Sequence, residues 1–258
     1  MYKIWSLDIV PFSVYNPWMD LSIVIPAYNE SKKIERDVRE ASDFLVSNHL
    51  AGEIIVVDDG STDNTSEIAK KNKVPSEVGL RILRYDNHRG KGYAVRKGIE
   101  QTSGQFVMFA DSGCCVPYKD TLIGIELIKN NECDIAHGSR KMSGCHIERP
   151  QNFYRRICSK IFHLFVIHDM KIPAEFTDTQ CGFKIYKGDI AKQLYSQCQT
   201  DGFVFDIEII MLAQKAGYRI KEFPIDWTCD PDTRLSPSRS SWRILKDLLQ
   251  IRKNMNRK

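Results

Sequence analysis

Four short apolar runs, separated by helical patterns and polar turns, most constrain what this chain can fold into. The runs span residues 21–26, 53–57, 81–85 and 105–110. After the first run, apolar residues recur three or four positions apart from Ile34 to Leu45, which predicts a helix over 34–46. Strands that alternate with helices at this spacing are typical of βαβ units. The first half of the chain therefore predicts an α/β fold with a mostly parallel sheet.

The same kind of pattern extends over the rest of the chain. Helices are predicted over residues 64–73, 93–101, 121–129 and 205–215. Strands are predicted over 134–138, at the end of the polar loop 177–184, and over 218–227. Apolar residues at helical spacing between Phe153 and Phe165 predict one further helix. A chain of 258 residues with these elements can bury the core of one large α/β domain.

We divide the chain into three parts. They are an irregular N-terminal extension (1–20), a single domain (21–235, with halves 21–117 and 118–235) and a basic amphipathic C-terminal helix (236–258). Ile244, Leu248 and Ile251 lie on one face of that helix, and Lys and Arg lie on the other. Such a helix can pack its apolar face on the domain, or it can lie on an anionic membrane surface. We expect membrane association.

Several classes of protein are disfavoured by what the sequence lacks. No apolar run reaches the ~18–20 residues needed to cross a bilayer, so we expect a soluble or peripheral protein. No signal peptide is seen and the eight cysteines form no CxxC pair, which favours free thiols in a reducing cytosol. A net charge of +4 is too small to indicate nucleic acid as a partner. The absence of GxGxxG and Walker A motifs argues against dehydrogenases and P-loop kinases.

Polar motifs at the predicted strand ends indicate a nucleotide site. Tyr28 and Glu30 follow the first strand, and Asp58 and Asp59 end the second. An aromatic ring can stack on a base, and carboxylates can accept hydrogen bonds from ribose hydroxyls. The glycine-rich turn 88–92 brings main-chain N–H groups and a lysine to one place, as phosphate binding requires. The alternatives are two capped turns between strand and helix, and a plain surface loop.

One further acid, Asp111, follows the fourth strand. The carboxyl ends of strands in an open α/β sheet are where ligands bind. Asp111 is therefore expected between the nucleotide site and whatever group the second half of the chain holds.

The chain carries seven motifs in a fixed order, namely IPAYNE, VDDGSTD, GKGYAVRKGI, FAD, GSR, DTQCGFK and FDIE. In this order they resemble the family 2 glycosyltransferases of GT-A fold, and most of all the dolichyl-phosphate and polyprenyl-phosphate glycosyltransferases. The resemblance extends from about Leu21 to Leu249. TQCGFK at 179–184 is nearer the dolichyl-phosphate β-glucosyltransferase branch than the mannose branch. The implied fold is a GT-A α/β sheet flanked by helices, with basic amphipathic helices for membrane association.

The resemblance implies an enzyme, an inverting hexosyltransferase. The donor would be a nucleotide diphosphate sugar, with UDP-glucose favoured and GDP-mannose second. The acceptor would be a dolichyl or polyprenyl phosphate at the cytoplasmic face of a membrane, where the protein would be peripheral, and Mg²⁺ or Mn²⁺ would assist. Three alternatives stay open: a family 2 transferase on a soluble glycan or polysaccharide, a nucleotide-sugar-binding protein that has lost catalysis, and a soluble sugar nucleotidyltransferase.

The resemblance also implies roles for individual residues. The residues implied to bind the nucleotide sugar are Pro26, Tyr28, Glu30, Asp58, Asp59, Lys91 and Asp111. Those implied to act in catalysis are Asp111, Arg140 and Gln180, with Asp111 also holding the metal. Those implied to bind the acceptor phosphate are Arg140, Arg155 and Ser159. The alternatives are that Arg140 is a surface salt-bridge partner and that Arg155 lies on the solvated face of a helix.

The sequence departs from the family pattern directly after Asp111. Gly113 stands where the second acid of the DxD motif is expected, and Cys115, a poor partner for a hard cation, stands at a further ligand position. Three interpretations follow. Asp111 binds the metal alone, with diphosphate oxygens and waters completing the shell; or Asp178 or Asp206 substitutes; or lysine and arginine replace the metal, or catalysis is lost. We expect the first.

Overall fold

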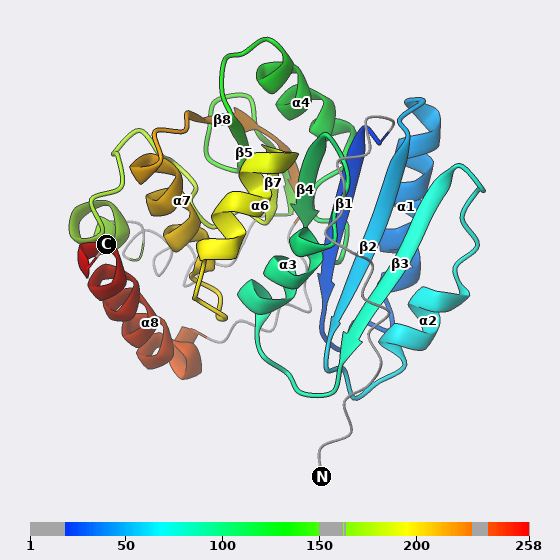
Figure 1. The fold of residues 1–258 in the computed structure, drawn as a ribbon, viewed down its shortest axis with the longest axis horizontal. Coiled ribbons are helices and arrows are strands. Elements are labelled where there is room, and N and C mark those ends of the chain that lie inside the picture. Colours follow the sequence, from blue (N-terminus) through cyan, green and yellow to red (C-terminus); the bar gives the residue numbers. More distant parts are fainter. Residues whose placement is uncertain (1–18, 150–161, 163, 229–236, 258) are drawn as a thin grey trace.

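The computed structural model describes residues 19–149, 162, 164–228 and 237–257. Within them a seven-stranded sheet is covered by helices on both faces (Figure 1). The predicted extension, residues 1–20, lies outside the described residues except for 19 and 20. So does most of the helix predicted between Phe153 and Phe165. Its described residues 162, 164 and 165 are helical, and the described helix extends to residue 169.

The strands of the main sheet lie in the order β3-β2-β1-β4-β7-β5-β8. They are β1 (Leu21–Ala27), β2 (Gly52–Asp59), β3 (Val78–Tyr85), β4 (Phe106–Ala110), β5 (Ile135–Ser139), β7 (Phe183–Lys187) and β8 (Ile220–Pro224). Only β7 runs antiparallel to its neighbours, β4 and β5, and the other pairs are parallel. The prediction of an α/β fold with a mostly parallel sheet is confirmed. A small second sheet pairs β6 (His146–Arg149) with β9 (Asp226–Thr228).

The helices divide between the two faces of the sheet. They are α1 (Ile34–Ser47), α2 (Thr65–Lys71), α3 (Lys91–Glu100), α4 (Thr121–Lys129), α6 (Gly188–Gln197), α7 (Phe205–Lys215) and α8 (Pro237–Arg257), with a short 3-10 turn at Tyr118–Asp120. In β1, Ile23 belongs to the core cluster that includes residues of α1, α2 and α4, whereas its neighbour Val24 belongs to the cluster that includes residues of α3, α6 and α7. Figure 1 shows α3 and α6 in front of the sheet and α1 and α2 behind it. β1, β2 and β4 are thus buried on both faces, which is why they appear as nearly continuous apolar runs.

Some predicted elements differ from the structure. The single strand predicted over 218–227 is two strands, because β8 ends at Pro224, which cannot donate to a ladder, and β9 then pairs in the other sheet. The sequence reading also missed α6 and β6. The C-terminal helix spans Pro237–Arg257, within one residue of the predicted range 236–258, and it begins at a proline, a residue well suited to the first turn of a helix.

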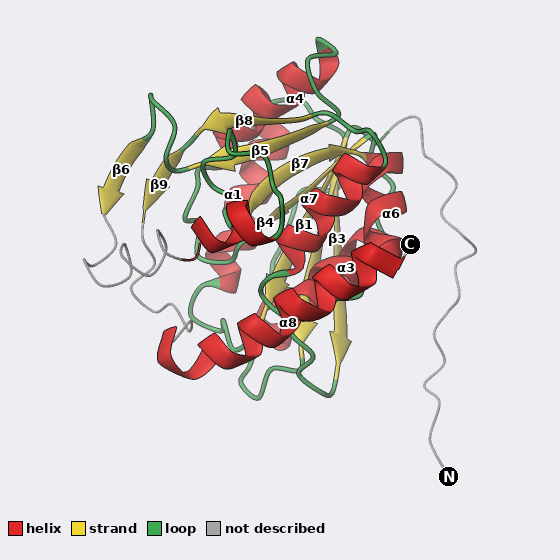
Figure 2. Cartoon of the chain, turned by 90° about the vertical axis from the view of Figure 1, so that its left-hand side faces the viewer, coloured by secondary structure: helices red, strands yellow, loops and turns green. Residues whose placement is uncertain are grey.

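The C-terminal helix α8 lies at the edge of the molecule, beside α7 (Figures 1 and 2). Leu248 and Ile251 are buried against Ile207 and Ile210 of α7 and against the segment 166–176. The apolar face of α8 therefore packs on the domain, which was one of the two alternatives for this helix. Its outward side remains basic, and none of the described helices is both long and apolar enough to cross a membrane. Membrane association stays a prediction.

Candidate active site

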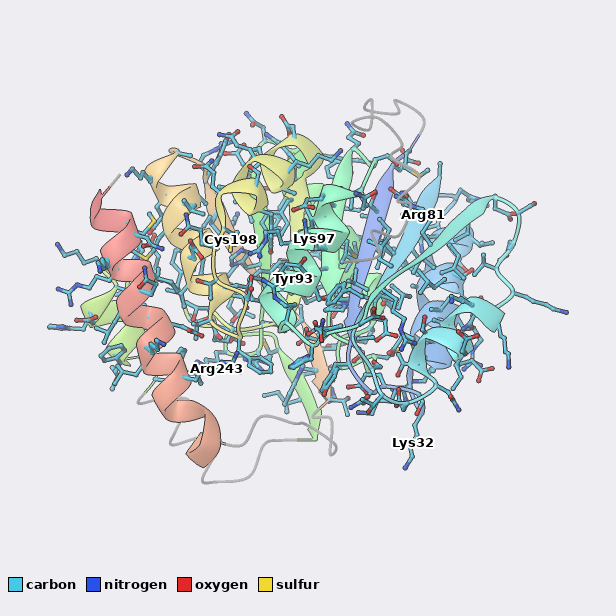
Figure 3. The ribbon with its side chains drawn as sticks, turned by 60° about the horizontal axis from the view of Figure 1, so that its bottom comes forward. Lys32, Arg81, Tyr93, Lys97, Cys198 and Arg243 are labelled. Carbon is cyan, nitrogen blue, oxygen red and sulfur yellow. The ribbon has the colours of Figure 1, made fainter. Side chains whose placement is uncertain are left out.

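Asp58 and Asp111, two of the acids predicted to act together, lie at the carboxyl-terminal edge of the sheet. Ala27, the last residue of β1, pairs with Asp58 near the end of β2, and Asp111 follows the last residue of β4. Figure 3 tilts this edge toward the viewer, with Tyr93 of α3 labelled near its middle and Arg243 of α8 to one side. The edge is where open α/β sheets bind ligands.

Asp59 holds the glycine-rich turn. Its two carboxylate oxygens accept hydrogen bonds from the main-chain N–H groups of Arg89 and Gly90, each at 2.8 Å. The Nδ1 atom of His88 lies 2.8 Å from Asp59 Oδ2. Only 2% of Asp59 is exposed, so its carboxylate is committed to the turn. Its predicted contact with the nucleoside stays a prediction.

Asp58 lies deeper than the sequence suggests. It is fully buried, and its Oδ1 accepts a hydrogen bond from the Ser61 N–H at 2.9 Å. The guanidinium of Arg84 is 3.7 Å from Oδ2. Asp58 therefore ties down the turn after β2, as a capped turn would, and its role toward a donor stays a prediction.

Tyr28 and His88 form an aromatic platform. Their rings stack with centroids 4.0 Å apart and planes 23° from parallel. Glu30, beside them, donates its main-chain N–H to Thr65 Oγ1 at 2.8 Å, and its carboxylate lies 3.3 Å from Lys33 Nζ. Pro26 is buried inside β1. The stacked pair is the type of surface on which a base can lie, although the nucleoside roles of Pro26, Tyr28 and Glu30 stay predictions.

The turn that precedes α3 fits only glycine at its centre. Gly90 has φ +123°, and a Cβ there would lie 2.4 Å from the carbonyl oxygen of Asp201. Arg89 and Arg96 both reach the Asp201 carboxylate, at 3.0 and 2.5 Å. The turn is thus clamped between β2 and the loop before α7, and α3 begins at Lys91, two residues before the predicted start.

Lys91 and Asp111 form the centre of the site. Lys91 Nζ lies 2.5 Å from Asp111 Oδ1 and within 6 Å of the ring centres of Phe109 and Phe205. Burial lowers the pKa of Lys91, but the carboxylates of Asp111 and Asp206 raise it by more, so its pKa lies above the ordinary value. Lys91 is therefore a fixed positive charge at neutral pH.

Asp111 lies directly against Gly182, both through its main chain and through its carboxylate. The Asp111 N–H donates to the Gly182 carbonyl at 2.9 Å, and a Cβ on Gly182 would lie 2.1 Å from Asp111 Oδ2. The buried Oδ1 atom of Asp111 is the oxygen that pairs with the Lys91 ammonium. Since 40% of the side chain is exposed, the carboxylate can still reach a ligand.

A cation at Asp111 would take its other ligands from the substrate. The described residues contain no group of three His, Cys, Asp or Glu side chains that could hold a metal. Asp178 and Asp206, weighed as substitute ligands, are each 2% exposed and bound in ion pairs with Arg140 and Lys184. Mg²⁺ commonly binds through one or two carboxylates together with substrate phosphates. The exposed carboxylate of Asp111 fits that single-carboxylate arrangement.

Arg140 is paired with a buried acid. Its Nε and Nη2 donate to the two carboxylate oxygens of Asp178 at 2.6 and 2.8 Å, and its guanidinium lies 5.3 Å from the Trp227 ring centre. Burial lowers the pKa of Arg140, but the Asp178 carboxylate raises it by more and Asp111 adds to the rise, so the pKa lies above its ordinary value. Arg140 therefore does form a salt bridge, as the alternative prediction held, but its partner Asp178 is buried and not on the surface. The pair fixes the guanidinium, 21% exposed, within electrostatic range of Asp111.

The remaining predicted residues are less informative. Gln180 donates its side-chain amide to the Thr179 carbonyl at 3.4 Å, in the loop that leads to Gly182. Arg155 and Ser159, predicted to assist Arg140, lie outside the described residues. The roles predicted for these three stay predictions.

Two residues of the site were missed by sequence reasoning. Lys184 of β7 is 1% exposed and donates to Asp206 Oδ1 at 2.5 Å and to the Cys181 carbonyl at 2.9 Å, so it holds the loop that carries Gly182. A lysine in the apolar strand 183–187 was the available signal. Asp37 of α1, 1% exposed, contacts the loop after β4. Its signal was a carboxylate three residues after Ile34, on the apolar face of the predicted helix.

Residues 22–194 match the sequence model of the family described as Glycosyl transferase family 2. The chain is 32% identical to the dolichyl-phosphate beta-glucosyltransferase of Dictyostelium discoideum, over 90% of this chain and 73% of that protein. It is 31% identical to the Homo sapiens protein of the same name, over 92% of this chain and 76% of the other.

Solved structures share the fold at lower identity. The glucosyl-3-phosphoglycerate synthase from Mycobacterium tuberculosis, solved with Mn²⁺, uridine diphosphate and glucosyl-3-phosphoglycerate, superposes with a TM-score of 0.64 and 19% identity over 90% of this chain and 80% of that one. The mannosyl-3-phosphoglycerate synthase from Rubrobacter xylanophilus gives 0.65 and 15%, over 93% and 76%. These likenesses confirm the expected GT-A type of fold. The family match over most of the domain and the relatives of 31–32% identity establish that this chain is a glycosyltransferase and belongs to glycosyl transferase family 2.

Proposed function

We propose that this enzyme transfers glucose from UDP-glucose to the phosphate of a dolichyl or polyprenyl lipid, with inversion at the sugar. The proposal is supported by the relatives named dolichyl-phosphate beta-glucosyltransferase. The structural observation that carries it is the placement of two cations, Lys91 and Arg140, within electrostatic range of the single carboxylate of Asp111. One cation suits a leaving diphosphate and the other suits an incoming phosphate.

The acceptor chemistry asks little of a general base. A phosphate monoester is largely an oxyanion at neutral pH, so its oxygen can attack the anomeric carbon directly while the bond from that carbon to the diphosphate oxygen breaks. What the site must supply is positioning and charge compensation. Arg140, held by Asp178, is already oriented, and arginine binds phosphate by two parallel hydrogen bonds.

On the donor side, Lys91 and the turn 88–92 lie where the diphosphate would bind. Lys91 stays protonated beside Asp111, so it can compensate the charge of the departing diphosphate. Tyr28 and His88 offer their stacked rings to the base. In the proposal a Mg²⁺ or Mn²⁺ ion held by Asp111 would also neutralise the diphosphate as a Lewis acid.

We place the enzyme at the cytoplasmic face of a membrane, bound peripherally. Arg243, Lys246 and Lys253 are exposed on α8, and 55% of Leu249 is exposed beside them. Each basic residue near an anionic surface contributes about 1 kcal/mol. Sedimentation with phosphatidylserine vesicles, but not with phosphatidylcholine vesicles, is expected; charge reversal at the three basic positions should abolish it. Equal binding of wild type and variant would exclude α8 as the contact.

One assay tests the proposed reaction. Purified enzyme is incubated with a panel of nucleotide sugars and a polyprenyl phosphate, with and without EDTA. Transfer from UDP-glucose to the lipid, lost with EDTA, is expected. Transfer to sugars but not to the lipid would favour a soluble glycan acceptor, and donor binding without transfer would favour a protein that has lost catalysis. Release of pyrophosphate would indicate a sugar nucleotidyltransferase.

A further inference from the structure

The loop after β4 is tied to α1 through the main chain of Gly113. The Gly113 N–H lies 2.9 and 3.0 Å from the two carboxylate oxygens of Asp37. The Sγ of Cys114 donates to Asp37 Oδ1 at 3.0 Å. From the neighbouring position on α1, Arg36 Nη2 donates to the Gly113 carbonyl at 2.6 Å. Two consecutive residues of one helix therefore hold both main-chain polar groups of Gly113.

Asp37 is unusual for a helix residue because it is almost completely buried. It is 1% exposed, and burial raises the pKa of its carboxyl although the bonds from Cys114 and Gly113 oppose the rise. A buried carboxylate is costly unless its oxygens are bonded. Here the described donors to it come from the loop after β4, so this loop is what satisfies it.

The loop conformation depends on glycine. Gly113 has φ +99°, in a region that residues with a side chain rarely adopt, and Cys114 follows with φ +46°. An aspartate at position 113 would therefore be strained whatever it could ligate. The glycine that replaces the expected second acid is needed for the main-chain contact with α1.

This contact lies two residues from Asp111. The main chain is fixed at Asp111, whose N–H donates to the Gly182 carbonyl at 2.9 Å, and again at Gly113, whose N–H donates to Asp37. Only Ser112 lies between the two fixed points. The main chain that carries the Asp111 carboxylate is thus held on both sides.

We infer that Asp37, with Arg36, is a positioning residue that locks the loop 112–115 through Gly113 and thereby aims the Asp111 carboxylate at the donor diphosphate. The inference rests on the proposed function for the identity of the ligand at Asp111. It explains how one acid can serve where two are expected, since an orientation that is fixed in advance loses less on binding. Asp37 itself touches neither donor nor acceptor in this account.

The test compares Asp37→Ala and Arg36→Ala with two matched variants on the exposed side of α1, Asp43→Ala and Arg39→Ala. Hydrogen–deuterium exchange is measured on a peptide covering residues 111–115. Binding of UDP and of GDP is measured by calorimetry with and without Mn²⁺. Outer partners of a metal ligand typically change affinity by about 10- to 100-fold. We expect such a loss for Asp37→Ala with Mn²⁺, a smaller loss for Arg36→Ala, faster exchange in both, and no change in the controls.

Two results would overturn the inference. One is wild-type exchange at 111–115 in folded Asp37→Ala. The other is faster exchange with unchanged nucleotide affinity, which would make the contact merely structural. If Asp37→Ala does not fold, Asp37→Asn, which keeps one acceptor oxygen, and Arg36→Ala decide by the same criteria. Exchange and nucleotide binding require no lipid acceptor, so a wild type that fails to glycosylate polyprenyl phosphate contradicts the proposed function and leaves this result standing.

Discussion

Replacing Lys184 by methionine should unfold the enzyme at markedly lower temperature. The ammonium of Lys184 is 1% exposed and is bonded to the 2% exposed Asp206 at 2.5 Å. Removing one partner of a buried pair leaves a charge without compensation, which typically costs about 3–5 kcal/mol. For a protein of this size that corresponds to a fall in Tm of roughly 6–20 °C. Thermal and urea unfolding measure the loss.

Two further variants separate the buried charge from other causes. Lys187→Met removes a lysine of the same strand whose partner Asp134 is 2.7 Å away, but 35% of its side chain is exposed, so a cost of about 1 kcal/mol or less is expected. The double variant Lys184→Met with Asp206→Leu replaces the buried pair by apolar groups and should recover most of the stability.

The pH dependence of stability also reports on the buried pair of Lys184 and Asp206. Burial already raises the pKa of Asp206 above its ordinary value, and Lys184 opposes that rise. Without Lys184 the pKa should rise further. A carboxyl with a raised pKa in the folded state adds stability at low pH and loses it as pH rises through that pKa. Lys184→Met should therefore be least destabilised in acid. A cost below about 1 kcal/mol at neutral pH, or one equal to that of Lys187→Met, would refute the account.

Three other predictions follow from single contacts. Gly90→Ala, whose Cβ would meet the Asp201 carbonyl at 2.4 Å, should lower stability by about 1–3 kcal/mol and weaken nucleotide binding in calorimetry. Arg140→Lys loses the bidentate bond to Asp178 and should lower kcat/KM for the lipid acceptor by about tenfold or more, with nucleotide affinity unchanged; equal loss for both substrates would contradict it. His137 is fully buried, and burial lowers its pKa well below the ordinary value, so the unfolded chain takes up a proton first as pH falls below about 6.5. His137→Leu should flatten the loss of unfolding free energy between pH 6.5 and 5, measured by urea titration, and an unchanged slope would exclude this role.

Much of the fold followed from local pattern. The runs that became β1, β2 and β4 are apolar on both faces, so their boundaries came within about two residues of the predicted ones. The pairing of β7 between β4 and β5 could not be predicted in this way, because register and direction depend on which strands meet in space. The split of 218–227 into two sheets depends on the same long-range pairing.

The site residues likewise fall into those that could be identified from the sequence and those that could not. Asp111 and Arg140 directly follow strands and Lys91 lies at the glycine-rich turn, so short motifs identified all three. The structure brings them into one region. Asp37 acts through the main chain of Gly113, and Lys184 pairs with the carboxylate of Asp206. Both partners are distant in sequence, and a local pattern shows only a charge in an apolar setting. The sequence shows that Gly113 stands where a second acid is expected. Only the structure shows that this glycine binds α1 through Asp37.

The most direct test of the central claim is the rate of glucosyl transfer from UDP-glucose to polyprenyl phosphate by wild type and Asp111→Asn over a titration of Mn²⁺, with Asp43→Asn as the control. Loss of one well-placed electrostatic group at a reacting centre commonly costs about 10²- to 10³-fold in kcat. The account predicts such a loss for Asp111→Asn, metal-dependent transfer in the wild type, and wild-type rates for the control. Full metal-dependent activity of Asp111→Asn would contradict it.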